Sequence, residues 1–176
     1  MKFPDQNICD LGVDCGGKAV DSVGLTPKFR QNIKRLTLSM ATAGYSGTAL
    51  IKKLGIKPEM KVLIINKPDD YYKLLEVDIT DQSCKKNETP DFIHLFVKSV
   101  KEFESEMKAL KNIYKKNSTV IIWVSWYKKA AKITTDITED VIRNYALENG
   151  LVDVKVCAVS DIWSGLKLVV PVAKRK

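Results

Sequence analysis

Short apolar runs alternate with helical patterns along most of the chain. The runs suited to buried strands cover residues 61–66, 91–97 and 119–124. Their nearly continuous apolar character favours burial on both faces, as in a parallel sheet. Two further runs, 151–159 and 163–172, are separated by a short break, which predicts an antiparallel hairpin at the end of the chain.

Helix signals lie between these runs. Ser99 begins a capping box ahead of a long apolar stripe, and Thr138 begins a second helix that Gly150 ends. Thr48 is placed to cap a short early helix. Residues 76–79 suit a short, weak strand.

Strands that alternate with helices predict an α/β fold of three layers, Rossmann-like, with a mainly parallel sheet and right-handed crossovers. The closing hairpin adds a C-terminal antiparallel element. Glycine and aspartate interrupt every apolar cluster near the start of the chain, so residues 1–42 are expected to be a flexible or loosely docked N-terminal extension. We expect a single α/β domain over residues 43–176.

The run at 119–124 passes directly into polar, aromatic and basic residues. Ligands of open α/β sheets bind at the carboxyl ends of the strands, so this edge is the expected site. The candidate ligand-binding residues are Asn66, Asp69, Ser125, Trp126, Lys128, Lys129, Asp136 and Trp163. Their rings, hydroxyl and cations suit a small anionic or planar ligand. The alternative is an exposed basic loop whose tryptophans only cover the sheet edge.

This pocket requires the 61–66 strand to lie inside the sheet, parallel to the strands at 91–97 and 119–124. The turn after it contains no Gly-x-Gly. Pro68 lacks an amide donor, and the carboxylates of Asp69 and its neighbour would repel a pyrophosphate. We therefore expect no cofactor.

The chemistry-bearing residues do not decide whether the protein is an enzyme. His94 is the only histidine; its apolar surroundings favour a hydrogen-bonded core residue, and a general base is the alternative. Ser125 lacks the Gly-x-Ser-x-Gly turn of hydrolases. The cysteines have no zinc-binding spacing, so no metal site is expected.

The charge adds little specificity. The 176 residues carry a formal net charge of +8, with a pI near 9.2, spread mostly as lysine. This spread favours a solvated surface over a nucleic-acid-binding stripe. No apolar run approaches the length of a membrane span, and the start of the chain lacks a secretory signal pattern, so we expect a cytoplasmic protein with no membrane partner. The oligomeric state is left open.

Several unusual segments, in order, resemble a family of small bacterial proteins known only as a domain of unknown function. These segments are GYSGT (44–48), KLGIKP (53–58), DFIHLF (91–96), WVSW followed by KK (123–129), LVDVKVCAV (151–159) and WSGLKLV (163–169). The order of elements is also similar to the second half of the S-adenosylmethionine-dependent methyltransferase fold.

These resemblances imply a methyltransferase-like scaffold that lacks the glycine-rich cofactor loop. The function expected from the sequence is a ligand- or partner-binding module. A divergent S-adenosylmethionine-dependent methyltransferase is the first alternative, and a weak nucleic-acid binder is the second.

Overall fold

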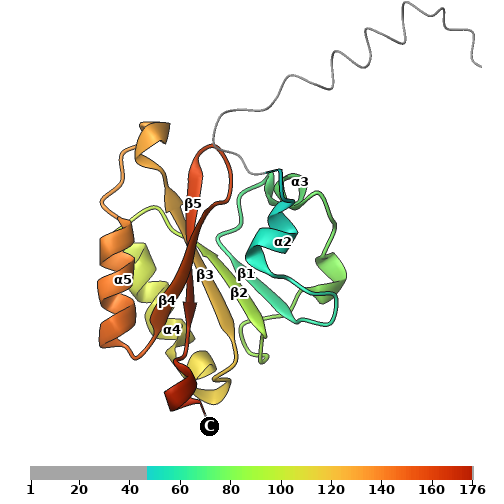
Figure 1. The fold of residues 1–176 in the computed structure, drawn as a ribbon, viewed down its shortest axis with the longest axis vertical. Helices are drawn as coiled ribbons and strands as arrows, with labels where there is room; N and C mark the ends of the chain where they lie inside the picture. Colours follow the sequence, from blue (N-terminus) through green and yellow to red (C-terminus); the bar gives the residue numbers. More distant parts are fainter. Residues whose placement is uncertain (1–46, 176) are drawn as a thin grey trace, which may run out of the picture. The chain divides into compact units, whose positions relative to one another are not determined.

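The computed structural model describes residues 47–175. The expected extension at residues 1–42 lies outside this part of the chain. The described strands form one five-stranded sheet in the order β1-β2-β3-β5-β4 (Figure 1). They are β1 (Val62–Ile65), β2 (Phe92–Phe96), β3 (Ile121–Tyr127), β4 (Val152–Ala158) and β5 (Trp163–Val169). The first three run parallel, and β5 is antiparallel to both β3 and β4, which confirms the α/β class and the closing hairpin.

Helices cover both faces of this sheet. They are α2 (Leu50–Leu54), α3 (Tyr71–Leu75), α4 (Val100–Lys116) and α5 (Glu139–Glu148), with short 3₁₀ turns at Thr80–Gln82, Lys129–Ala131 and Val172–Lys174. Figure 1 shows α4 and α5 on one side of the sheet and α2 and α3 on the other. The three layers expected from the sequence are therefore present.

Alternation along β3 divides the core between the two sides. Val124 packs in the cluster beneath α4 and α5, whereas Trp123 packs in the cluster beneath α2 and α3. Trp123 is fully buried, and its indole nitrogen donates a hydrogen bond to the carbonyl oxygen of Leu54 at 3.0 Å. This bond ties the end of α2 to the middle of the sheet.

The strong helix signals are confirmed. The Ser99 hydroxyl accepts a hydrogen bond from the amide of Glu102, and the Thr138 hydroxyl accepts one from the amide of Val141. Gly150 follows α5 with a φ of 76°, in the left-handed region that favours glycine.

Two weaker expectations are wrong. Ala49, rather than Thr48, occupies the N-cap of α2, so Thr48 lies one position too early to cap it. No strand forms at 76–79, because the Asp78 carboxylate accepts hydrogen bonds from the amide and hydroxyl of Thr80. Such local side-chain bonding stabilises a turn in competition with a strand.

The position of β1 also differs from the expectation. β1 is parallel to β2, as expected, but lies at an edge of the sheet. Three of its four side chains are nevertheless buried and Ile64 is half-buried, since helices cover both faces and the segment at Ser83 and Cys84 runs along its outer side. The Cys84 amide donates to the carbonyl oxygen of Val62 at 3.0 Å. Most of β1 is therefore buried although only one strand, β2, lies beside it.

Gly165 gives a direct test of packing at the sheet centre. A Cβ atom there would lie 3.0 Å from Val159 Cγ2, 3.2 Å from Ser125 Oγ and 3.3 Å from Trp123 Cε3. We expect Gly165→Ala to lower the free energy of unfolding by about 2 kcal/mol through overpacking, measured by urea denaturation. Gly47→Ala is the control, because nothing lies within 4 Å of its Cβ position. Equal midpoints for the two variants would contradict this packing.

Candidate functional site

A cavity of about 420 Å³ opens beyond the carboxyl end of β3. One wall comes from Trp126 and Tyr127 at the end of the strand and from Lys128 and Lys129 directly after it. The facing wall comes from residues 135–140, which lead into α5. This is the sheet edge at which α/β proteins bind their ligands.

Hydrogen bonds fix the loop that forms the facing wall. The Thr135 hydroxyl donates to the carbonyl oxygen of Lys98 at 2.8 Å and accepts from the amide of Ile137 at 3.3 Å. The Asp136 carboxylate accepts from the amide of Val100 at 3.0 Å. Asp136 thus anchors the loop to the start of α4, and it does not line the cavity.

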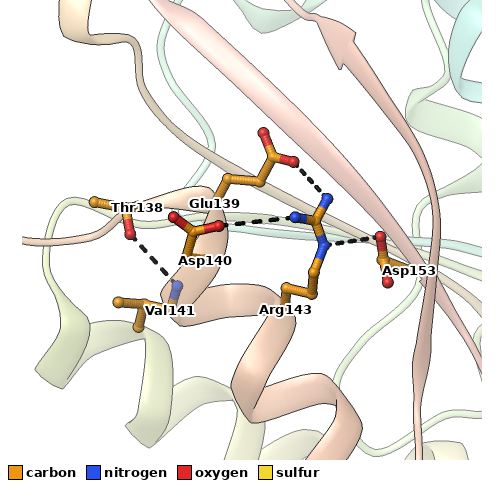
Figure 2. Close-up of polar contacts among 6 residues, drawn as sticks. All are labelled: Thr138, Glu139, Asp140, Val141, Arg143 and Asp153. Atoms are coloured by element: carbon orange, nitrogen blue, oxygen red, sulfur yellow. Dashed lines mark hydrogen bonds and ion pairs between the residues drawn. The ribbon is translucent and has the colours of Figure 1, made fainter.

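An arginine holds the carboxylates at the start of α5 (Figure 2). The Arg143 guanidinium lies 2.6 Å from Glu139 and 3.7 Å from Asp140, and its Nε donates to Asp153 of β4 at 3.0 Å. The hydrogen bond with Asp153 is the main cause that raises the pKa of Arg143. Because one guanidinium is shared among three carboxylates, this wall of the cavity keeps a net negative charge.

The N-terminus of α5 is satisfied within the protein itself. Thr138 caps it through the amide of Val141, and its first turn already contains Glu139 and Asp140 (Figure 2). The bare helix end is therefore not an anion site.

Cations dominate the opposite wall. Lys128 is half-buried and Lys129 is exposed. Neither lysine forms an ion pair with any carboxylate in the part of the chain that the structure describes. The cavity therefore carries unpaired positive charge on its β3 side and carboxylates on its α5 side.

Two other sequence candidates point away from the cavity. Ser125 is 0% exposed and Trp163 is 4% exposed, both on the α2/α3 side of the sheet. The Trp163 ring stacks on Tyr127, with centroids 4.2 Å apart and planes at 25°. Trp163 therefore does not line the cavity, and it affects the cavity only by packing against the ring of Tyr127.

The remaining candidates lie at the β1 edge. The Asn66 side-chain amide donates to Glu102 at 2.9 Å and to the carbonyl oxygen of Phe96 at 3.3 Å. It fastens the turn after β1 to the start of α4. Asp69 is exposed, and neither residue lines the cavity. Because β1 lies at an edge of the sheet, the pocket expected across the ends of three parallel strands is not formed. Of the sequence candidates, the cavity at the end of β3 contains only Trp126, Lys128 and Lys129.

Some cavity residues were not among the sequence candidates. Thr135, Glu139 and Asp140 line the cavity, although the sequence marks the last two only as residues of a first helical turn. The available signal is the connection itself: the loop from β3 leads directly into α5, so the start of α5 lies at the same end of the sheet.

A buried polar network runs through the α2/α3 layer. The Tyr71 hydroxyl lies 2.8 Å from His94 Nδ1, and His94 Nε2 lies 2.8 Å from the Ser125 hydroxyl. Burial lowers the pKa of His94 to about 3 and raises the pKa of Tyr71. His94 is therefore a neutral, hydrogen-bonded core residue, and its complete burial argues against a general base.

Metal chemistry finds no support in the described residues. Among residues 47–175, no group of three or more histidine, cysteine, aspartate or glutamate side chains is placed to hold a metal ion. Cys84 and Cys157 are half-buried free thiols.

Within residues 47–175, every helix is too short or too polar to cross a lipid bilayer.

The sheet order and the layers define a three-layer, Rossmann-like α/β protein whose sheet ends in an antiparallel hairpin. No protein-family model matches the chain, and no curated protein matches it. Solved structures do resemble it. Magnesium protoporphyrin IX methyltransferase from Synechocystis with bound SAM aligns with a TM-score of 0.44 and 12% identity, over 89% of this chain and 87% of that chain.

Two further structures show the same level of similarity. A protein in the NADB-Rossmann superfamily from Streptococcus agalactiae has a TM-score of 0.41 and 11% identity, over 71% of this chain and 69% of that one. Ribosomal protein L11 methylase from Lactobacillus delbrueckii subsp. bulgaricus has a TM-score of 0.37 and 12% identity, over 72% and 75%. Similarities this low carry no inference about activity.

Proposed function

We propose that the protein is a binding module for a small ligand, which occupies the cavity at the carboxyl end of β3. The observation that carries this proposal is the pair of lysines, Lys128 and Lys129, that face the cavity without a carboxylate partner among the described residues. A volume of about 420 Å³ falls within the range of small-molecule sites.

The two walls suggest how such a ligand is oriented. Its anionic group pairs with the ammonium groups of Lys128 and Lys129. A hydrogen-bond donor on the ligand meets the carboxylates of Glu139 and Asp140, and its apolar part lies against the accessible edge of Trp126. The ligand class is therefore a small molecule that carries an anion and a donor on opposite sides.

The turn after β1 supports a role without a bound dinucleotide or similar cofactor. Asn66 has a φ of 54°, and its side chain closes the turn through Phe96 and Glu102. Phosphate-binding turns instead use glycines, so that backbone amides approach the phosphate closely. Pro68 offers no amide at this position.

A divergent S-adenosylmethionine-dependent methyltransferase is the second candidate function. The specific observation in its favour is the strand order β1-β2-β3-β5-β4 with a closing antiparallel hairpin. This order agrees with the methyltransferase resemblance of the sequence, and it is an analogy of layout rather than of site chemistry.

Titration calorimetry with a panel of small probes separates these functions. The panel contains inorganic phosphate, glutamate, S-adenosylmethionine and S-adenosylhomocysteine. For a probe that binds the cavity, we expect Lys128→Ala to weaken binding about tenfold or more, since a hydrogen bond to a charged group contributes about 1.5–3 kcal/mol. Lys73→Ala is the control, because Lys73 is an exposed lysine of α3 outside the cavity.

The outcomes are distinct. Binding that is equally strong in wild type and Lys128→Ala contradicts the proposed site. Micromolar binding of S-adenosylmethionine that does not depend on Lys128, accompanied by methyl transfer, favours the second candidate. A panel with no binding member contradicts the binding module.

A further inference from the structure

Lysines gather on the α2/α3 side of the sheet, over β4 and β5. Lys155 of β4 and Lys167 of β5 are direct cross-strand partners, so their side chains leave the same face. Lys167 is also opposite Trp123 of β3, which places this face on the α2/α3 side. Like charges placed directly opposite each other destabilise a sheet. The repulsion between Lys155 and Lys167 therefore destabilises the folded protein at this position.

Two more lysines extend this surface. The Lys155 ammonium lies 3.5 Å from the carbonyl oxygen of Lys53 at the end of α2. Lys53, Lys128 and Lys155 all act on the thiol of the half-buried Cys157, where burial raises the pKa and the lysines oppose it. We call Lys53, Lys128, Lys155 and Lys167 the lysine face.

Most of this charge is not balanced within the described residues. Lys128, Lys155 and Lys167 make no ion pair with any described carboxylate. Burial, followed by the charge of Lys155, lowers the pKa of Lys167. An anionic partner would relieve this repulsion.

An aromatic ring stands beside the lysine face. Tyr127 is half-buried, precedes Lys128 at the end of β3, and stacks on Trp163 from the same side of the sheet. Proteins that bind single-stranded nucleic acid combine a positively charged surface with aromatic rings on which bases stack. The lysine face draws on α2, β4, β5 and the end of β3, which is wider than a single phosphate requires.

We propose that the lysine face binds the phosphate backbone of a single-stranded nucleic acid, with Tyr127 as a stacking surface for a base. The sequence alone favoured a solvated lysine surface, because the positions of these lysines are far apart along the chain. Lys128 and Tyr127 adjoin both surfaces, whereas Lys53, Lys155 and Lys167 lie outside the cavity, so changes at these three lysines test the proposal separately from the cavity ligand.

Fluorescence anisotropy with the full chain tests the proposal. The probes are labelled oligo(dT) and oligo(U) of about 12 nucleotides, titrated between about 50 mM and about 300 mM salt. The triple variant Lys53→Gln, Lys155→Gln, Lys167→Gln should flatten the slope of log affinity against log salt by about two, since each backbone contact to a single strand contributes about 0.7.

A matched control removes the same charge elsewhere. Lys101, Lys108 and Lys115 are exposed on α4, on the other side of the sheet. Their triple change to Gln should leave the slope unchanged. Replacement of Lys53, Lys155 and Lys167 by Arg should preserve binding, which separates loss of charge from loss of fold.

Several results would overturn the proposal. They are no binding at the lowest salt, an equal loss in both Gln triples, and displacement of the oligonucleotide by polyglutamate of the same charge at the same concentration. Tyr127→Leu should weaken binding roughly tenfold with the salt slope unchanged, because stacking is not ionic. Full affinity in Tyr127→Leu would remove the stacking role.

Discussion

Between pH 6.5 and pH 3, the free energy of unfolding is expected to fall by about 4–5 kcal/mol because of His94 alone. Burial lowers the pKa of His94 to about 3 in the folded protein, from an ordinary value of 6.5. As the pH falls, His94 therefore becomes protonated near pH 6.5 in the unfolded chain but only near pH 3 in the folded chain. The contribution of His94 is fully present above pH 6.5 and is lost as the pH falls through this window.

Urea denaturation at several pH values measures this effect. Between pH 6.5 and pH 5, the expected loss is up to about 1.4 kcal/mol per pH unit, and few carboxylates titrate there. His94 is the only histidine of the chain, so the slope is attributable to one residue. The control is His94→Phe, which should lack the slope over the same interval. A slope that persists in His94→Phe would show that another group is responsible.

The second large effect is expected from His94→Phe itself, at pH 7. Phe preserves the aromatic stacking against Phe96, which the imidazole makes with centroids 4.3 Å apart. It leaves the buried hydroxyls of Tyr71 and Ser125 without the partner that each has 2.8 Å away. Because an orphaned buried polar group costs about 1–3 kcal/mol, we expect a loss of about 3 kcal/mol in the free energy of unfolding.

Apolar replacement of the whole network should reverse most of this loss. Adding Tyr71→Phe and Ser125→Ala removes both orphaned hydroxyls, and such complete replacement is close to neutral in favourable cases. Tyr114→Phe is the control, because the buried Tyr114 hydroxyl has no hydrogen-bond partner among the described residues. It should be neutral or stabilising. A triple variant less stable than His94→Phe would contradict this account of the network.

The sequence predicted the layers because buried apolar residues recur with a different spacing in a strand and in a helix, and this spacing can be read along the chain. Ser99, Thr138 and Gly150 were read correctly since each acts on its own helix end, with partners a few residues away. The edge position of β1 was not predictable in this way. Apolar periodicity reports how many faces of a strand are covered, and it carries no information on whether a second strand or a loop lies alongside.

The site shows a similar division. A cavity lies beyond the end of the run at 119–124, and its role as a ligand site stays a prediction. However, Ser125 faces the opposite side of the sheet from Trp126 and is fully buried there, so it does not line the cavity. Ser125 turns instead to His94, and the pairing of these residues depends on the register between β2 and β3. No local pattern in the sequence encodes that register.

The borders of the sheet have a consequence for how the protein behaves at high concentration. At β1, Ser83 and Cys84 occupy part of the outer hydrogen-bonding positions. At β4, an irregularity interrupts the ladder between Asp153 and Lys155, and Lys155 is exposed. A foreign strand adds most readily to a long, straight, uncharged border. Neither border is both uninterrupted and uncharged, so we expect each to pair poorly with a strand of another molecule at high concentration.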